Sequence, residues 1–259
     1  MEGARLQPLA SLVGFSQARL VGRYALLLVH LLLLPVLHVV TEGHPRAEIF
    51  SIFAEQAILI GAAAALGGMR MLWFGLPLAL PGLATALVVL TGGDPGAWAD
   101  AWVVARAVSF IVPIMTICLL ILVDVLAAER VVFDMICGAL CVYVLLGMCW
   151  ANLYVLLERL VPGSFTVDFA RYGVDPQADP FSMCGVFLYY SFVTLTTVGY
   201  GDICPSSAVA RWLVWVQAVF GQFYMAVFVA RLIGMQVPAS VAGPADAAAT
   251  SLPRSRQAA

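Results

Sequence analysis

Residues 181–202 read FSMCGVFLYYSFVTLTTVGYGD, and the organisation of the chain follows from them. The first part, Phe181–Thr196, is apolar and hydroxyl-rich but too short to cross a bilayer, which takes about 20 mostly apolar residues. It is therefore predicted to be a re-entrant helix, which enters the membrane and turns back. The helix leads directly into Thr197-Val198-Gly199-Tyr200-Gly201-Asp202.

The composition around this segment is that of a membrane protein. Of 259 residues, 63% are apolar and 11% charged, with a mean hydropathy of +0.98. Soluble domains are about 45–50% apolar and about 25% charged, and disorder requires low hydrophobicity. The apolar residues form long blocks, which indicates helices rather than a β-barrel. The net charge of −2 gives no indication of a nucleic-acid partner.

The apolar blocks predict an all-α membrane protein with six transmembrane helices. The re-entrant segment lies between the fifth and the sixth. The predicted spans are Tyr24–Val40, Ile49–Gly68, Met71–Leu90, Trp102–Val123, Val131–Leu157 and Ala208–Met235.

The distribution of arginine predicts the orientation, because cytoplasmic loops carry an excess of positive charge. With both termini in the cytoplasm, most arginines outside the spans lie on the inner side. These are Arg5, Arg19, Arg23, Arg70, Arg130, Arg231, Arg254 and Arg256, against Arg46, Arg159, Arg171 and Arg211 outside. Residues 1–23 form a cytoplasmic segment, and residues 236–259, rich in Ala, Pro and Ser, are predicted to be a disordered cytoplasmic tail.

The hexapeptide Thr197–Asp202 resembles the selectivity filter of potassium channels, the TVGYG segment at the end of a half-membrane pore helix. The match to that motif is complete. The resemblance implies a bacterial plasma-membrane channel with one pore domain per chain, which conducts K⁺ passively. It covers residues 131–235 as outer helix, pore helix, filter and inner helix. Residues 24–123, the four-helix N-terminal region, stand outside it with no assigned role.

The residue types of this segment suit cation coordination. A dehydrated monovalent cation needs oxygen ligands, and backbone carbonyls supply them when consecutive residues point their C=O groups at one axis. Such a ribbon alternates in handedness, and glycine reaches positive φ without steric cost. The carbonyls of Thr197, Val198, Gly199 and Tyr200, with the Thr197 hydroxyl, are therefore the predicted K⁺ ligands, completed by Gly201. One chain supplies one ribbon, so a ring of four predicts a homotetramer.

The resemblance also implies partners for the filter. In similar channels the acid after the filter, here Asp202, is hydrogen-bonded to an aromatic side chain of the pore helix, often Trp. This chain offers Tyr189 or Tyr190, and both remain open.

Two interpretations are open for Gly221 in the last span. In similar channels a glycine near this point is a gating hinge, but a glycine also permits close helix packing. Helical periodicity counted from Gly221 predicts a cavity-lining face formed by Gln222, Met225, Val229 and Ile233.

The four N-terminal spans lack a voltage sensor. Voltage-sensing helices carry an arginine at every third position, because each charge moved supplies about 2.3 kcal/mol per 100 mV. The fourth span has Arg106 alone, so we expect a voltage-insensitive channel. Glu55 either has a proton-sensing or inter-helix role, or lies near the membrane interface or pairs with Gln or Ser. His30 and His38 are either pH-sensing groups or ordinary hydrogen-bonded side chains. The gating stimulus is left open.

The loop after the fifth span leaves two further questions open. Its acids, Glu158 and Asp168 among them, form either a cation-attracting vestibule or an ordinary solvated loop. Cys184 and Cys204 flank the filter, and a disulfide between them is left open.

Two other functions remain alternatives to a K⁺ channel. One is a weakly selective cation channel, against which Tyr200 argues. The other is a non-conducting scaffold or regulatory subunit that retains the pore fold. No nucleophile–base pair, metal cluster or phosphate loop occurs in the sequence, so neither an enzyme nor a bound cofactor is expected, apart from K⁺ as the permeant ion.

Overall fold

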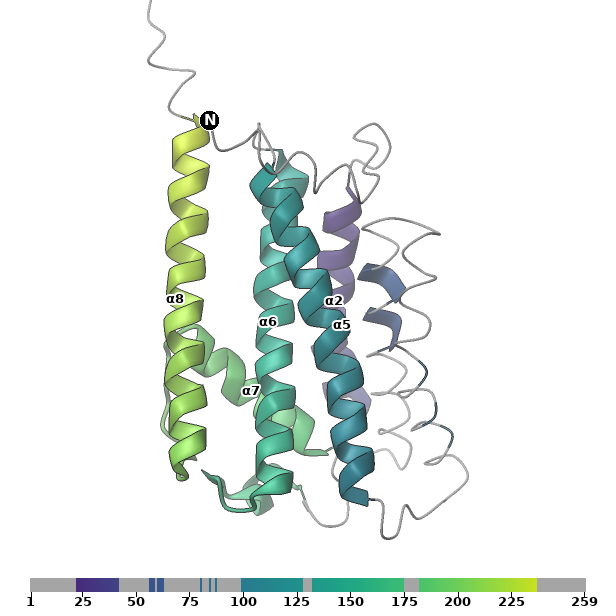
Figure 1. Cartoon of the computed structure of the whole chain (residues 1–259), viewed down its shortest axis with the longest axis vertical. Helices are drawn as coiled ribbons and strands as arrows, with labels where there is room; N and C mark the ends of the chain where they lie inside the picture. The colour runs from purple at the N-terminus through teal and green to yellow at the C-terminus, as the bar shows by residue number, and fades with distance from the viewer. Residues whose placement is uncertain are drawn as a thin grey trace, which may run out of the picture.

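The computed structural model describes residues 22–41, 56–58, 60–62, 80, 84, 87, 99–127, 132–174 and 182–236. Within these ranges the chain is mainly helical (Figure 1). The long helices are α2 (Arg23–Thr41), α5 (Ala99–Ala127), α6 (Phe133–Leu160) and α8 (Ala208–Gln236). The shorter elements are β1 (Phe165–Thr166), the 3-10 helix η2 (Phe169–Tyr172), α7 (Ser182–Leu195) and β2 (Cys204–Pro205).

Three helices in the described part of the chain are long and apolar enough to cross a bilayer. They are Ala107–Ala127, Phe133–Leu160 and Ala208–Arg231. These correspond to the predicted fourth, fifth and sixth spans, so the prediction of a helical membrane protein is confirmed. The predicted first span coincides with α2, whose Arg23–Leu33 part is a shorter apolar helix. The predicted spans Ile49–Gly68 and Met71–Leu90 lie largely outside the described residues, and the total of six stays a prediction.

Helix α7 has half the length of its neighbours. Its 14 residues extend about 21 Å at 1.5 Å per residue, whereas the hydrocarbon core of a bilayer is about 30 Å thick. It lies between α6 and α8, beside the C-terminal half of α6 (Figure 1). The chain therefore has a half-length apolar helix at the position where the sequence predicts a re-entrant one.

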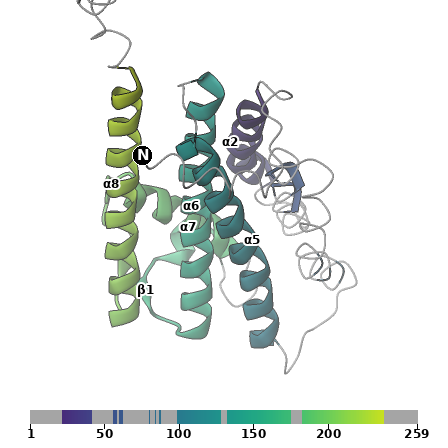
Figure 2. The ribbon, with the colours of Figure 1, turned by 45° about the horizontal axis from the view of Figure 1, so that its top comes forward.

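The core of the bundle lies between α2, α5 and α6. Leu31 of α2, Ile114 and Ile121 of α5, and Leu145 of α6 are fully buried in it. Helix α8 stands at the opposite side of α6 from α5 and α2 in both views (Figures 1 and 2). Only 11% of the α8 span is buried within the chain, against 44% for α6.

A polar cluster of Arg23, Tyr24, Asp124 and Asp134 joins α2, α5 and α6 at one end of the bundle; we call it the α2 anchor. Arg23 forms an ion pair with Asp124, and its Nε lies 4.0 Å from an Asp134 oxygen. The Tyr24 hydroxyl donates to Asp124 at 2.6 Å. Asp134 accepts the first backbone N–H groups of α2, from Tyr24 at 2.9 Å and Ala25 at 3.1 Å. These N–H groups have no partner inside their own helix, so Asp134 caps α2 from a different helix.

The end of α8 is tied to the same end of the bundle. An Arg231 guanidinium N–H donates to the backbone carbonyl of Leu126, near the end of α5. Close packing supports the arrangement, because a Cβ added at Gly138 of α6 would lie 2.9 Å from the Tyr24 ring. The N-terminal part of the chain is therefore fastened to both long helices of the C-terminal half.

Candidate functional site

A buried polar network holds α7 between α6 and α8. The Ser191 hydroxyl donates to the Gly147 carbonyl of α6 at 2.7 Å. The Gln217 amide of α8 donates to the Ser191 hydroxyl at 2.7 Å and to the Ser191 carbonyl at 3.1 Å. The Tyr154 hydroxyl donates to the Gln217 carbonyl oxygen. Since unpaired buried polar groups are costly, this network favours a single position of α7.

An aromatic cluster packs behind α7 and contains Tyr190. Its ring centroid lies 5.4 Å from that of Tyr154 and 5.6 Å from that of Phe165. Phe187 joins the cluster, with its ring 5.0 Å from Phe165. The alternative of Tyr190 as the Asp202 partner does not hold in this structure, because the Tyr190 side chain is buried on the packing side of the helix.

Helix α7 ends in a tight hydrogen-bonded turn that leads into the predicted filter. The Thr197 N–H donates to the Thr194 carbonyl at 3.0 Å, and the Val198 N–H to the Val193 carbonyl at 2.9 Å. This pair of bonds is a Schellman motif, in which glycine usually occupies the left-handed position. Here Thr197 occupies it, with φ 60°. A β-branched residue in this region is strained, and such strain clusters at functional sites.

Positive φ alternates along the predicted filter. It occurs at Thr197, Gly199 (56°) and Gly201 (81°), and neither Val198 nor Tyr200 has it. The positive φ values at Gly199 and Gly201 were predicted, because glycine adopts them without steric cost. The positive φ at Thr197 was not predicted, because this residue is not a glycine. More than half of the Val198 and Tyr200 side chains is exposed within the single chain.

Asp202, directly after the predicted filter, is held by two tyrosine hydroxyls. Tyr189 of α7 donates to Asp202 Oδ2 at 2.7 Å, and Tyr172 of η2 donates to the same oxygen at 2.9 Å. Asp202 Oδ1 accepts the Ile203 N–H at 3.2 Å. The Tyr189 hydroxyl bond, with that of Tyr172, lowers the pKa of Asp202 below its ordinary value. The Tyr189 ring also stacks on that of Tyr200, with centroids 6.5 Å apart and planes 7° apart.

Tyr172 could not be identified from the sequence. It lies at the end of η2, outside any motif and thirty residues before its acceptor, and no periodicity links the two positions. The pairing of Asp202 with Tyr189 of α7, in contrast, is one of the two alternatives that the sequence leaves open.

The segment before α7 is fastened to the segment after the predicted filter, and we call these paired segments the outer platform. Strands β1 and β2 pair antiparallel, with Phe165 opposite Pro205 and Thr166 opposite Cys204. The Thr166 and Ser206 hydroxyls lie 2.6 Å apart. The chain before α7 and the chain after the predicted filter are thereby paired with each other.

Neither alternative proposed for the outer-loop acids describes Glu158. This residue belongs to α6 and is buried, so it faces neither a vestibule nor solvent. Its carboxylate accepts the N–H groups of Gly163 at 2.8 Å and Phe165 at 3.0 Å. Those backbone donors compensate its burial. Asp168 instead accepts the Arg171 N–H at 3.3 Å and caps η2.

No disulfide joins Cys184 and Cys204 in the structure. The exposed Cys204 donates to the Gly201 carbonyl at 3.4 Å, at the end of the predicted filter. Among the other open residues, His30 is half-buried with its Nε2 unpaired. Glu55 and the side chains of His38 and Arg106 lie outside the described residues.

Gly221 lies against the end of α7. A Cβ added there would be 2.8 Å from Leu195 Cδ1 and 3.1 Å from the Leu195 carbonyl oxygen. That oxygen also accepts the Tyr143 hydroxyl of α6 at 3.1 Å. The geometry demonstrates close packing, one of the two interpretations of Gly221, while its role as a hinge stays a prediction.

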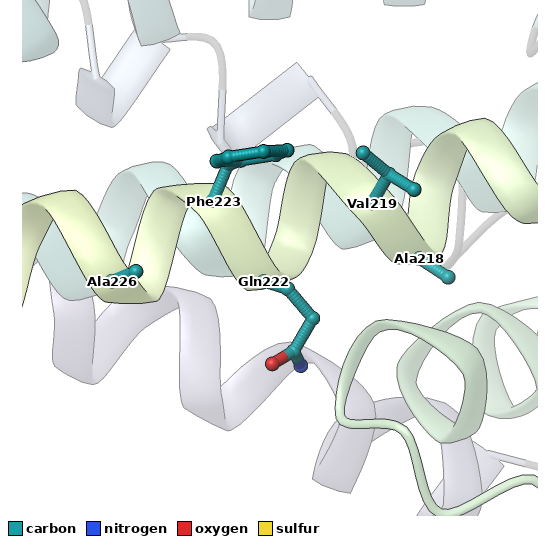
Figure 3. A pocket seen from close by; sticks show the side chains of 5 residues that line it. All are labelled: Ala218, Val219, Gln222, Phe223 and Ala226. Atoms are coloured by element: carbon teal, nitrogen blue, oxygen red, sulfur yellow. The ribbon is translucent and has the colours of Figure 1, made fainter.

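The residues predicted to line a cavity all lie on exposed parts of α8. Gln222, Met225, Val229 and Ile233 are each exposed. Of these four residues, Gln222 alone is among those that line a groove of about 420 Å³ on α8. Figure 3 shows its five labelled side chains, among which Gln222 supplies the amide. The lining residues are Ala218, Val219, Gln222, Phe223 and Ala226.

Comparison with known proteins gives one family match. The family described as "Ion channel" matches residues 164–236, the part that contains β1, η2, α7, β2 and α8. No curated protein and no solved structure matches the chain significantly. Residues 164–236 therefore match an ion-channel domain, a non-enzymatic kind of domain, and this match supports passive ion conduction. Together with the three apolar helices long enough to span a bilayer, it indicates a membrane protein.

Proposed function

We propose that this chain is one subunit of a homotetrameric, potassium-selective and voltage-insensitive channel of a bacterial inner membrane. K⁺ moves through it passively, down its electrochemical gradient. Both termini face the cytoplasm, on the side of the α2 anchor, and the outer platform faces the opposite side. The excess of arginine in the predicted inner segments supports this orientation.

The observation that carries the proposal is the position and conformation of Thr197–Gly201. The complete TVGYG motif follows a half-length apolar helix and has positive φ at alternate residues. Alternating backbone handedness is what a ribbon needs to direct successive carbonyls toward one axis. The carbonyls of Thr197, Val198, Gly199 and Tyr200, with the Thr197 hydroxyl, then replace the hydration shell of K⁺.

Exposure within the single chain supports the tetramer. The carbonyls of a single ribbon surround K⁺ on one side only. A complete ring of oxygen ligands therefore needs four copies of the chain around a common axis. The ribbon and the apolar face of α8 are both largely exposed. In the proposed assembly, neighbouring subunits and lipid cover these surfaces, and the exposed groove at Gln222 faces the central cavity.

The absence of a voltage-sensing arginine series supports voltage insensitivity. Helix α5, which contains the predicted fourth span, has Arg106 as its one basic residue. Moving a single charge across the membrane supplies about 2.3 kcal/mol per 100 mV, far less than steep voltage gating requires. The N-terminal helices therefore have a different role from a voltage sensor.

The test is K⁺ flux into liposomes that contain the purified full-length protein. We compare the wild type with Gly199→Ala, which adds a Cβ to a residue with φ 56°. A side chain there costs about 1–2 kcal/mol and disturbs the carbonyl alignment, so flux should be lost. Gly61→Ala is the matched control, because its added Cβ meets nothing nearer than 3.9 Å.

Three outcomes separate the functions. K⁺ flux that exceeds Na⁺ flux and is lost in Gly199→Ala supports the proposal. Equal K⁺ and Na⁺ permeability identifies a weakly selective cation channel instead. Equal flux from wild type and Gly199→Ala, or none from the wild type, rejects conduction through this segment and favours the scaffold. Mass determination of the intact particle tests the tetramer independently.

A further inference from the structure

Asp202 is fixed by donors from two separate segments. One is Tyr189, which belongs to α7, and the other is Tyr172, which belongs to η2. Both hydroxyls donate to the same oxygen, Oδ2, at 2.7 and 2.9 Å, while Oδ1 accepts the Ile203 N–H. A carboxylate with a single side-chain donor can rotate about that hydrogen bond. Two donors from separate segments restrict the Asp202 carboxylate to one orientation.

The donor from η2 is itself held in place. Asp168 caps the start of η2 through the Arg171 N–H, and Gly173 closes its end with a left-handed φ of 67°. Upstream, the Ser164 carbonyl accepts the Ser206 N–H at 2.8 Å. The Tyr172 hydroxyl is thus presented by the outer platform, which is bonded to the chain on the far side of the filter.

Aromatic contacts connect the two tyrosines that hold Asp202 to the proposed filter. The Tyr172 ring lies 6.4 Å from the Tyr189 ring, which stacks in turn on Tyr200. Tyr200 supplies one of the proposed K⁺-binding carbonyls. A shift of Tyr172 therefore reaches the ion site through one carboxylate and one aromatic stack.

We propose that Tyr172 is a positioning residue for the filter. Through Asp202 it holds the outer end of the filter in the conducting conformation, so that the loop before the pore helix sets the lifetime of that conformation. This inference rests on the proposed function, because it assigns a regulator to the same site. Tyr172 touches neither the ion nor the K⁺ ligands and acts through Asp202.

The experiment uses full-length channels in planar bilayers and measures how fast K⁺ current is lost after opening. Tyr172→Phe removes the hydroxyl and keeps the ring. We expect it to leave the conducting state about five times faster, equivalent to about 1 kcal/mol. Tyr24→Phe is the matched control, because it removes a hydroxyl bond to a different aspartate, Asp124, at the other end of the bundle. The control should keep the wild-type lifetime.

Two further readouts distinguish positioning from general support of the fold. Raising external K⁺ should slow the loss of current in Tyr172→Phe, because bound ions stabilise the conformation that binds them. In an Asp202→Ala background, Tyr172→Phe should add nothing, because its acceptor is gone. The thermal unfolding midpoint of Tyr172→Phe should remain close to that of the wild type.

The outcomes also separate this inference from the proposed function. A wild type that conducts no K⁺ contradicts the proposed function itself. If the wild type conducts and Tyr172→Phe keeps its lifetime, or shortens it equally with and without Asp202, the positioning role is rejected. If Tyr172→Phe does not assemble, the role is rejected in favour of a structural one.

Discussion

Gly221→Ala separates the two interpretations of this glycine. The added methyl group would lie 2.8 Å from Leu195 Cδ1 and 3.1 Å from the Leu195 carbonyl oxygen. The first distance is below any ordinary contact, and the second involves backbone that cannot rotate away. Leu195 is also the last residue of α7, two positions before Thr197. The clash should therefore be transmitted to Thr197, at the start of the proposed filter.

The expected magnitude follows from two opposing effects. Inserting a methyl group into a well-packed site costs about 1–3 kcal/mol, while replacing Gly by Ala inside a helix contributes about 0.8–1.0 kcal/mol of stabilisation. The two ranges together give a net destabilisation between about 0 and 2 kcal/mol. Because one of the two close contacts is with the Leu195 backbone oxygen, which cannot move aside as a side chain can, we expect a value in the upper half of that range. A hinge without close packing predicts the opposite sign, because only the helix-propensity effect remains.

The assay is thermal unfolding of the purified assembly, with Gly61→Ala as control. Truncating the neighbour tests the contact directly. In the double variant Gly221→Ala/Leu195→Ala, the combined cost should fall below the sum of the single costs by about 1 kcal/mol, as for residues in contact. A Gly221→Ala protein as stable as the wild type, or strictly additive costs in the cycle, would refute the packing argument.

Three further predictions concern other contacts. Gln217→Leu should destabilise the protein by about 1–3 kcal/mol for each buried group left unpaired, as measured by thermal unfolding, whereas Gln222→Leu on the exposed side of α8 should not. Asp134→Ala should raise hydrogen exchange in the first turn of α2, because two backbone N–H groups lose their acceptor; unchanged exchange would contradict the capping role. The lowered pKa of Asp202 means that its bonds are present above the ordinary value of 3.8 and weaken as outer pH falls through the folded pKa. K⁺ current should therefore be lost faster in acid, and pH-independent lifetimes would argue against this coupling.

The spanning helices in the described part of the chain, and the positive φ at Gly199 and Gly201, could be predicted from local sequence alone. Long apolar blocks determine spanning helices, because only internally hydrogen-bonded backbone is tolerated in lipid. The predicted span Val131–Leu157 is shifted by a few residues from α6, Phe133–Leu160. The predicted span Ala208–Met235 begins at the same residue as α8 and ends one residue before it. Glycine at 199 and 201 likewise marks positive φ, since its freedom is a property of the residue itself.

Side-chain partners could not be predicted in this way. Tyr189 and Tyr190 are adjacent and chemically identical, and only the rotation of α7 against Tyr154 and Phe165 decides that Tyr189 reaches Asp202. Tyr172 gave no signal, because its partner is distant in the chain. From the sequence, Glu158 is expected to be a loop acid, because the predicted span ends at Leu157. In the structure α6 includes Glu158, and the backbone N–H groups of Gly163 and Phe165 bind its carboxylate.

Sequence therefore determined what each segment is: apolar helices of given length, a short helix, and a ribbon with glycine at alternate positions. Tertiary structure alone decided which groups meet, as at Gly221 with Leu195 and at Asp134 with the start of α2. The physical reason is the distance along the chain over which each interaction acts. Hydropathy and backbone freedom act within a few residues, whereas contacts between helices depend on the rotation and offset that packing of the whole bundle selects.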